Sequence, residues 1–523
     1  MSAPAKAELL TKNIRRKEME QQLNTVWTRF FDLIKIPYPK TPALPQGDAT
    51  QMLGYFENYA KTNRFDFEVD DCQNACISVE ASYGHDKDRE IVVQGHHDAV
   101  FVGEPDPSIN GVNPVTTEDG KWVKGDTTNL TADNRLGVAL TLTAVENLVK
   151  SGKVHGPVKI LLTAGEDSGL IGATYLGETK SKFLDGNQTL INVDSSEGPE
   201  WLTIGCASGS RDQLTIPVNY EAIGDKKLVK FGFSGFPGGH SGLDIGKDRP
   251  SSIRFFAELF ADLKQEFPNI GLASLKAGEA FNSISVGSEF ILTINVQDEV
   301  RVQEFIDQYI ERMKREIPAN APEEFRNSRV NIKASPKSLI GDETLIQNQM
   351  DKTTSNHLIN VLLAIPQGVG EKEGDEILSS NNIGTVEIAQ DKIIIQAMTR
   401  GKETSFRDKL REQIKAVAKK ENVLVEEKLS YRHWSPQPER LLIKLAKEIG
   451  EAVLKKEIKT RVSLGGLEPG IFEGVFPGLE AISISAARIE NEHSLAEQAE
   501  INSLEDGYTF LTALLTEIPK IYS

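Results

Sequence analysis

The sequence contains few cysteines and no long apolar run. Its 523 residues include only three cysteines, which are too few for a disulfide framework and have no zinc-finger partners. No segment approaches the eighteen or so apolar residues that a membrane span needs, so we expect no membrane partner. Residues 1–22 carry interspersed charges without an apolar core. We therefore expect no secretory signal, and a reducing, cytoplasmic location.

Basic residues are in the minority. The chain has 59 lysines and arginines against 76 aspartates and glutamates, a formal net charge of −17. This balance argues against a broad surface for nucleic acid. Walker loops, dinucleotide fingerprints and the Gly-x-Ser-x-Gly elbow are also absent, so nucleotide, redox and nucleophilic-serine functions lose support.

The order of apolar segments predicts an α/β fold. Short apolar strands alternate with helical segments up to about Cys206, which is typical of a mostly parallel sheet sandwiched by helices. The expected elements include helices 6–36, 49–62 and 134–151 and strands 90–94, 158–163 and 189–193.

The pattern changes after Cys206. Strands 214–220, 227–233 and 289–296 with helices 251–267 and 300–317, and later strands 385–389 and 392–398 with helix 404–420, predict an inserted α+β lid of two related units. The first pattern returns from Pro436, with strand 481–485 and helices 440–455 and 503–518. We predict a catalytic domain of residues 1–207 and 434–523 and a lid of residues 208–433.

Histidines or carboxylates follow nearly every predicted strand of the catalytic domain. Side chains alternate faces along a strand, so His96 and Asp98 share a face while His97 points the other way. The carboxyl edge of an open α/β sheet is where sites form. The other candidates at this edge are Asp133, Glu166, Asp167, Asp194 and His493.

These residue types indicate a metal site. Two histidines with three or more carboxylates and no thiolate suit zinc, and also manganese or cobalt. Five ligands are too many for one tetrahedral ion with an open position, so two ions that share a carboxylate fit better. Glu166 stands beside Asp167, so one carboxylate can bind metal while its neighbour acts as a general base.

With these residues the chain resembles a known family, the dinuclear zinc metallopeptidases of aminoacylase and carboxypeptidase type. It is most similar to the bacterial aminoacyl-histidine dipeptidases (Xaa-His dipeptidases), and the likeness runs over nearly the whole chain. The matching stretches are 95–100, 132–134, 165–173, 192–194, 205–207, 238–245, 466–470 and 492–494.

The resemblance implies a role for each candidate. His96 and Asp167 would hold one ion, Asp194 and His493 the other, and Asp133 would bridge both, at a peptide bond to Asn134 that is often cis in such enzymes. The remaining roles fall to six residues: Asp98 orients His96, Glu166 is the general base, His240 stabilises the carbonyl oxyanion from the lid, and Glu468, Asn282 and Arg400 contact the substrate.

The chain departs from the dipeptidase pattern at a few positions. Asp167 replaces the usual glutamate, and Leu464 and Pro469 stand where the group tends to have histidine and cysteine. These differences bear on which substrate is chosen more than on whether hydrolysis takes place.

The resulting hypothesis is metal-dependent hydrolysis of dipeptides or small peptides by a water activated by two ions. The alternatives are an N-acyl-amino-acid amidohydrolase that uses the same site, and a non-catalytic metal-binding scaffold. Lids of this family often pair, so by resemblance we expect a homodimer through the lid.

Overall fold

The computed structural model describes residues 3–40, 47–186, 188–242, 244–315, 332–337, 339–389 and 391–522. The chain forms two compact units. The first comprises Met1–Cys206, Trp434–Ser463 and Leu467–Ser523, and the second comprises Ala207–His433 and Leu464–Gly466.

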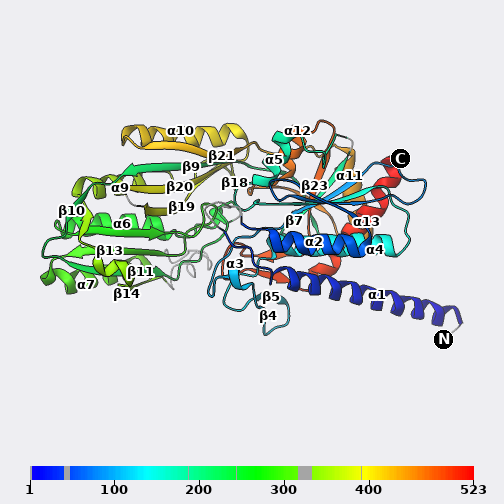
Figure 1. Cartoon of the computed structure of the whole chain (residues 1–523), viewed down its shortest axis with the longest axis horizontal. Coiled ribbons are helices and arrows are strands. Elements are labelled where there is room, and N and C mark those ends of the chain that lie inside the picture. The colour runs from blue at the N-terminus through cyan, green and yellow to red at the C-terminus, as the bar shows by residue number, and fades with distance from the viewer. Residues whose placement is uncertain are drawn as a thin grey trace. The chain divides into compact units, whose positions relative to one another are not determined.

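The described residues of the first unit build an eight-stranded sheet in the order β1-β2-β6-β3-β7-β23-β8-β22. Its strands β7 and β23 are labelled in Figure 1. Its central strands β6, β3, β7 and β23 are parallel, whereas β1 and β2 form an antiparallel edge. The bounds are β1 Asp66–Val69, β2 Ala75–Val79, β3 Ile91–His96, β6 Val158–Thr163, β7 Thr189–Ser195, β8 Trp201–Cys206, β22 Lys459–Ser463 and β23 Glu480–Ser485.

Helices cover both faces of this sheet, as alternation along its buried strands requires. In β3, Ile91 and Val93 join the core formed with α1, α4 and α13, while Val92 joins the core formed with α5 and α12. The helices are α1 Ala3–Leu33, α2 Thr50–Asn63, α4 Ala132–Lys150, α5 Ile171–Thr179, α11 Leu441–Leu454, α12 Pro469–Val475 and α13 Ser503–Tyr522. This architecture confirms the predicted α/β class.

Smaller elements complete the first unit. The short helix α3 is Pro107–Asn110, and a four-stranded sheet has the order β24-β25-β5-β4. Its strands are β4 Pro114–Thr116, β5 Trp122–Gly125, β24 Ile489–Glu490 and β25 Gln498–Glu500. None of the described helices of the chain is long and apolar enough to cross a membrane.

The described part of the second unit is built on one nine-stranded sheet, in the order β14-β11-β13-β12-β19-β20-β9-β21 with β16 paired to β19. The ladder between β12 and β19 has only two residue pairs, Lys276 with Glu387 and Ala277 with Val386. The bounds are β9 Ser208–Pro217, β11 Lys227–Ser234, β12 Gly271–Ala277, β13 Ser288–Ile294, β14 Lys333–Lys337, β16 Gly368–Val369, β19 Ser379–Ala389, β20 Lys392–Gly401 and β21 Leu424–Tyr431.

Among the described residues of this unit, four helices pack with the sheet around one apolar core. They are α6 Ser252–Glu266, α7 Glu299–Arg315, α9 Lys352–Ala364 and α10 Thr404–Lys420. Two short two-stranded sheets accompany them, β10 Tyr220–Ala222 with β15 Asn348–Met350 and β17 Lys372–Glu373 with β18 Glu376–Ile377.

Most predicted elements are present, with shifted bounds. The strand predicted at 214–220 is β9, which begins at Ser208 and ends at Pro217, because proline has no N–H with which to continue a ladder. The last two residues of the helix predicted at 300–317 lie outside the described residues.

Candidate metal centre

Two neighbouring parallel strands bring His96 and Asp194 together. His96 is the last residue of β3, and Gln94 of the same strand pairs with Asn192 of β7. Two residues further along, on the same faces, the pairing places His96 beside Asp194. Nε2 of His96 lies 3.4 Å from Oδ1 of Asp194.

Asp133 lies between two histidines. It is the second residue of α4, and its peptide bond to Asn134 is cis. Its Oδ1 lies 3.1 Å from Nε2 of His96, and its Oδ2 lies 3.1 Å from Nε2 of His493. Each carboxylate oxygen therefore faces a different imidazole, which is the arrangement of a bridging ligand.

His493, the second histidine of the site, is paired with Asp167, which follows β6. Nε2 of His493 lies 2.9 Å from Oδ1 of Asp167. Donor atoms of His96, Asp133 and Asp194 thus form one group, those of Asp133, Asp167 and His493 form a second, and those of His96, Glu166 and Asp167 form a third.

The shortest contacts favour a different division of ligands from the one implied by the resemblance. The resemblance pairs His96 with Asp167 and His493 with Asp194, and His96 and Asp167 do belong to one of the three groups. The register of β3 against β7 instead puts His96 beside Asp194, while Asp167 lies in the loop four residues beyond the end of β6 and reaches His493.

The spacing of the donor atoms fits metal ions. Ligands of a tetrahedral ion with bonds of about 2.0–2.1 Å lie about 3.3 Å apart. The contacts of His96 and His493 described above span 2.9 to 3.4 Å. With only nitrogen and oxygen donors, the two groups suit a pair of divalent ions of the zinc, manganese or cobalt kind.

The electrostatics of the cluster favour cations. Burial alone would lower the pKa of His96, but Asp194, Asp133 and Asp98 raise it well above its usual value. The pKa of His493 is likewise raised by Asp167 and Asp133 in spite of burial. Burial raises the pKa of Asp194 to about 7, with Asp133 and Asp167 adding to the effect against His96. Negative charge is therefore concentrated where the ligands meet.

Asp98 and Glu166 lie next to the ligands without joining the two groups that contain Asp133. Oδ1 of Asp98 lies 3.3 Å from Nδ1 of His96 and accepts a hydrogen bond from the backbone N–H of Glu166 at 3.0 Å. Oε2 of Glu166 lies 3.9 Å from Nε2 of His96. Burial, together with the charges of Asp167, Asp194 and Glu468, raises the pKa of Glu166 well above its usual value.

His97 points into the core, on the opposite face from His96. Its Nε2 lies 3.0 Å from the carbonyl oxygen of Gln73, which can only accept, so Nδ1 is the nitrogen that accepts from the Tyr38 hydroxyl at 3.1 Å. Burial lowers the pKa of His97 to about 4. This neutral ring supports the strand and leaves His96 as the histidine that faces the carboxylates.

Glu468 is buried beneath the cluster. Its Oε2 accepts hydrogen bonds from Nε2 of Gln94 and, at 2.8 Å, from Oγ1 of Thr163. Its Oε1 has no hydrogen-bond partner among the described residues. Burial raises the pKa of Glu468 to about 8, against the influence of His96.

The second unit brings its three candidate residues together. Nη2 of Arg400 lies 3.4 Å from Nε2 of His240 and donates to Oγ of Ser241 at 3.2 Å. The backbone N–H of Ser241 donates to the carbonyl of Asn282 at 2.9 Å. His240, Asn282 and Arg400, which are far apart in the sequence, thus form one polar cluster.

Sequence reasoning missed several residues around the ligands. Glu497 is 1% exposed and binds the backbone before Asp133, and Glu492, beside His493, is also buried, with a pKa raised by burial and by Asp133. Gln94, whose amide joins Glu468 to Asn192, is predicted from the sequence only as part of a strand. The one available signal was position, since these residues stand close to the predicted ligands in sequence.

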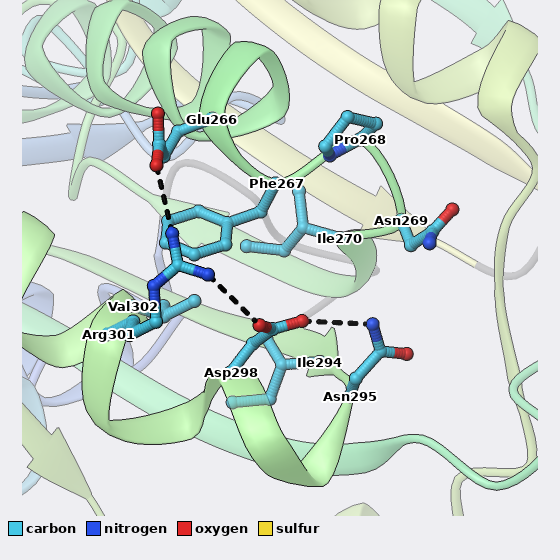
Figure 2. Close-up of a pocket in the computed structure, with 10 residues that line it drawn as sticks. All are labelled: Glu266, Phe267, Pro268, Asn269, Ile270, Ile294, Asn295, Asp298, Arg301 and Val302. Atoms are coloured by element: carbon cyan, nitrogen blue, oxygen red, sulfur yellow. Dashed lines mark hydrogen bonds and ion pairs between the residues drawn. The ribbon is translucent and has the colours of Figure 1, made fainter.

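Two further pockets lie away from the metal cluster, and no candidate residue lines either of them. One, of about 210 Å³ in the second unit, contains Arg301, whose guanidinium is 3.0 Å from Glu266 and 3.6 Å from Asp298 (Figure 2). The positive charge of Arg301 is thus balanced by these two carboxylates. The other, of about 690 Å³ in the first unit, is lined by α1, α4, α11 and α13.

Comparison with known proteins identifies the family of the chain. A model of peptidase family M20/M25/M40 matches residues 92–517. The cytosol non-specific dipeptidase of Escherichia coli (strain K12) is 28% identical over 511 residues, which cover 94% of this chain and 97% of the relative.

Solved structures show the same fold. Aminoacylhistidine dipeptidase from Vibrio alginolyticus aligns with a TM-score of 0.56 and 23% identity, over 94% of this chain and 96% of that one. Human carnosine dipeptidase 1 aligns with a TM-score of 0.53 and 13% identity, over 96% and 98% of the two chains. The family predicted from the motifs is confirmed, and the chain belongs to peptidase family M20/M25/M40.

Proposed function

We propose that this protein is a metal-dependent dipeptidase that hydrolyses dipeptides or small peptides. The observation that carries the proposal is Asp133, whose two carboxylate oxygens each face one histidine, in a chain that belongs to a peptidase family. A relative matched over nearly its whole length is named as a non-specific dipeptidase of the cytosol, and we propose the same compartment for this chain.

Five residues would hold two divalent ions, with zinc the default. His96 and Asp194 would bind one, Asp167 and His493 the other, and Asp133 both. When bound, such ions would polarise the scissile carbonyl and lower the pKa of a water, so that hydroxide is available to attack the carbonyl carbon.

The proton transfers fall to Glu166. Its mostly buried carboxyl has a raised pKa, which suits a group that first accepts a proton from the water and later donates one to the leaving amine. Asp98 holds both His96 and Glu166 in place. Its Oδ1 lies beside Nδ1 of His96 and also accepts a hydrogen bond from the backbone N–H of Glu166. The ring orientation and the base are thereby held by one side chain.

The second unit would supply the oxyanion donor. We assign this role to His240, whose ring lies beside the guanidinium of Arg400. Arg400 and Asn282, in the same cluster, would contact the substrate. A donor carried by a separate unit allows the site to be completed when substrate is present.

Glu468 would distinguish a dipeptide from an N-acyl amino acid. Its Oε1 lacks a hydrogen-bond partner among the described residues, and a free α-amine needs an acidic or carbonyl partner. Glu468→Gln should therefore lower kcat/KM for dipeptides by about 10-fold, the loss of one hydrogen bond to the amine. Unchanged dipeptide kinetics in this variant would remove the amine anchor.

The deciding experiment is a substrate panel. Purified protein is loaded with zinc, manganese or cobalt and assayed on dipeptides and on N-acyl amino acids. We expect dipeptides to be cleaved faster. Exclusive cleavage of acyl amino acids would establish the amidohydrolase alternative, and the absence of any hydrolysis with ions bound would establish the scaffold alternative.

We also propose that the protein forms a homodimer through residues 208–433. Sedimentation velocity of the full chain measures it directly. A dimer that is lost when residues of the second unit are changed supports the prediction, and a monomer at all concentrations contradicts it.

A further inference from the structure

Glu497 connects the loop of one candidate metal ligand to the backbone of another. It lies four residues after His493 and is 1% exposed. Its Oε1 accepts hydrogen bonds from the backbone N–H groups of Ala132 at 2.8 Å and Asp133 at 3.3 Å. Its Oε2 accepts from the backbone N–H of Thr131 at 2.9 Å and from Nδ2 of Asn129 at 3.0 Å.

These contacts satisfy backbone N–H groups that precede the regular part of α4. Thr131 has φ +57°, in the left-handed region, and its side chain makes no capping hydrogen bond, while Asp133 and Asn134 have φ and ψ values outside the helical region. The N–H groups of Thr131, Ala132 and Asp133 therefore lie before the first regular turn, where a buried N–H without a partner is costly. The carboxylate of Glu497, from a distant part of the chain, supplies their acceptor.

The loop that carries Glu497 is itself braced. The backbone N–H of Glu497 donates to the carbonyl of Ser494 at 3.0 Å, and the hydroxyl of Ser494 donates to the carbonyl of Asn491 at 2.7 Å. His493 lies inside this turn. Glu497 therefore fixes the start of α4 relative to the turn that presents His493.

We propose that Glu497 is a positioning residue that holds Asp133 in the bridging position between His96 and His493 and thereby sets the affinity of the site for metal. The inference rests on the proposed function, since it takes Asp133 and His493 as ligands. Residues that orient metal ligands typically contribute 10- to 100-fold to metal affinity.

A carboxylate is required because four N–H donors converge on two oxygens. A glutamine of the same size would keep one oxygen but would turn an NH₂ group toward two other N–H groups, where donor meets donor. Glu497→Gln should therefore weaken metal binding almost as much as Glu497→Ala. Glu497→Asp, which keeps the charge on a shorter arm, should recover part of the loss.

The test is a cobalt titration of the full-length protein, followed by the visible absorption of the bound ion. We expect E497Q to bind cobalt about 10- to 100-fold more weakly than wild type, with an altered spectrum at saturation, and E497D to lie between the two. The matched control is E490Q, an exposed glutamate of the neighbouring strand β24, which should behave as wild type.

Wild-type affinity and spectrum in E497Q would overturn the inference, as would an E497D variant as weak as E497A. If E497Q does not fold, judged by circular dichroism, E497D decides, and wild-type cobalt affinity in that variant overturns the inference. Failure of the proposed function has a different signature, because the wild-type protein itself would then bind fewer than two ions or leave dipeptides uncleaved.

Discussion

Burial sets the chemistry of the carboxylates at the scale of single residues. Glu166 is mostly buried, near Asp167, Asp194 and Glu468, and these neighbours together with desolvation keep its pKa high. Asp133 shows the opposite balance, because hydrogen bonds from His493 and His96 outweigh burial and hold its pKa below the usual value. One carboxyl is thus suited to carrying a proton and the other to staying ionised between two cations.

Replacing the base tests this division of roles. Glu166→Ala should lower kcat for a dipeptide by about 10²- to 10⁴-fold, the usual contribution of a general base, while the bound metal is retained. Steady-state kinetics and metal analysis of the same sample measure both quantities. Glu178→Ala, an exposed position on α5, is the control. Two bound ions with undiminished hydrolysis would contradict the role of Glu166.

The candidate residues could be found from sequence, but their partnerships could not. His96, Asp194 and Asp167 were identified because each follows an apolar strand whose carboxyl end meets one sheet edge. Which of them share an ion depends on the register of β3 against β7, and this is not encoded in any local pattern. Glu497 was missed for the same reason, since its partners are backbone groups more than 360 residues away in the sequence.

At the scale of elements, α1 is held to the first unit by its buried face. Phe30 is fully buried and packs in the main core with Val26 and Leu33. Arg29 adds polar contacts to α4 through Glu146 and Thr143. The amphipathic helix predicted from the spacing of these apolar residues therefore packs as expected.

Truncation of Phe30 measures the strength of this packing. Phe30→Ala should reduce the free energy of unfolding by about 3–5 kcal/mol, because it removes a fully buried aromatic side chain and leaves a cavity. Urea unfolding followed by tryptophan fluorescence gives the value. Thr28→Ala, exposed on the same helix, should change it by less than about 0.5 kcal/mol. Equal midpoints for the two variants would contradict the packing role.

Lys264 makes the packing of α6 against α9 depend on pH. Burial and the nearby Lys352 lower its pKa from 10.5 to about 8, although its Nζ donates to Ser355. As the pH falls from 10.5 to 8, Lys264 is protonated in the unfolded chain before it is protonated in the folded chain. The free energy of unfolding therefore decreases over this range and does not decrease further below pH 8.

Lys264→Met should accordingly stabilise α6 and α9 at pH 7. We expect a gain of about 1 kcal/mol, after discounting for solvent screening of a half-exposed group. The gain should shrink as the pH rises from 8 toward 10.5. Hydrogen exchange of the two helices in both proteins, at pH 7 and pH 9.5, measures the difference. A gain that is constant with pH would show that the charge of Lys264 is not its cause.

Long apolar periodicity predicted most elements, and short or weakly patterned ones were missed. The helices α6, α7 and α10 were predicted within a few residues of their bounds. Helix α9 was not predicted, although Asp351 caps it by accepting from the backbone of Thr354, a local signal that could have been read. Strand β8 was overlooked because its sequence leads directly into β9.

At the scale of the whole molecule, the catalytic candidates are divided between two units. All five proposed ligands and Glu166 belong to the first unit, whereas His240, Asn282 and Arg400 belong to the second. The prediction of an inserted lid rests on the βα pattern, which stops after Cys206 and returns after Pro436. The joining of nine described strands of the second unit into one sheet could not be predicted, since it depends on a two-pair contact between β12 and β19.

The central claim is that this peptidase uses two ions bridged by Asp133. The most direct test is metal analysis of zinc-loaded wild-type protein and of Asp133→Ala, with dipeptide hydrolysis measured on the same samples. We expect about two zinc ions per wild-type chain, and at most about one, with at least about 100-fold slower hydrolysis, in the variant. Two ions and undiminished hydrolysis in Asp133→Ala would contradict the account.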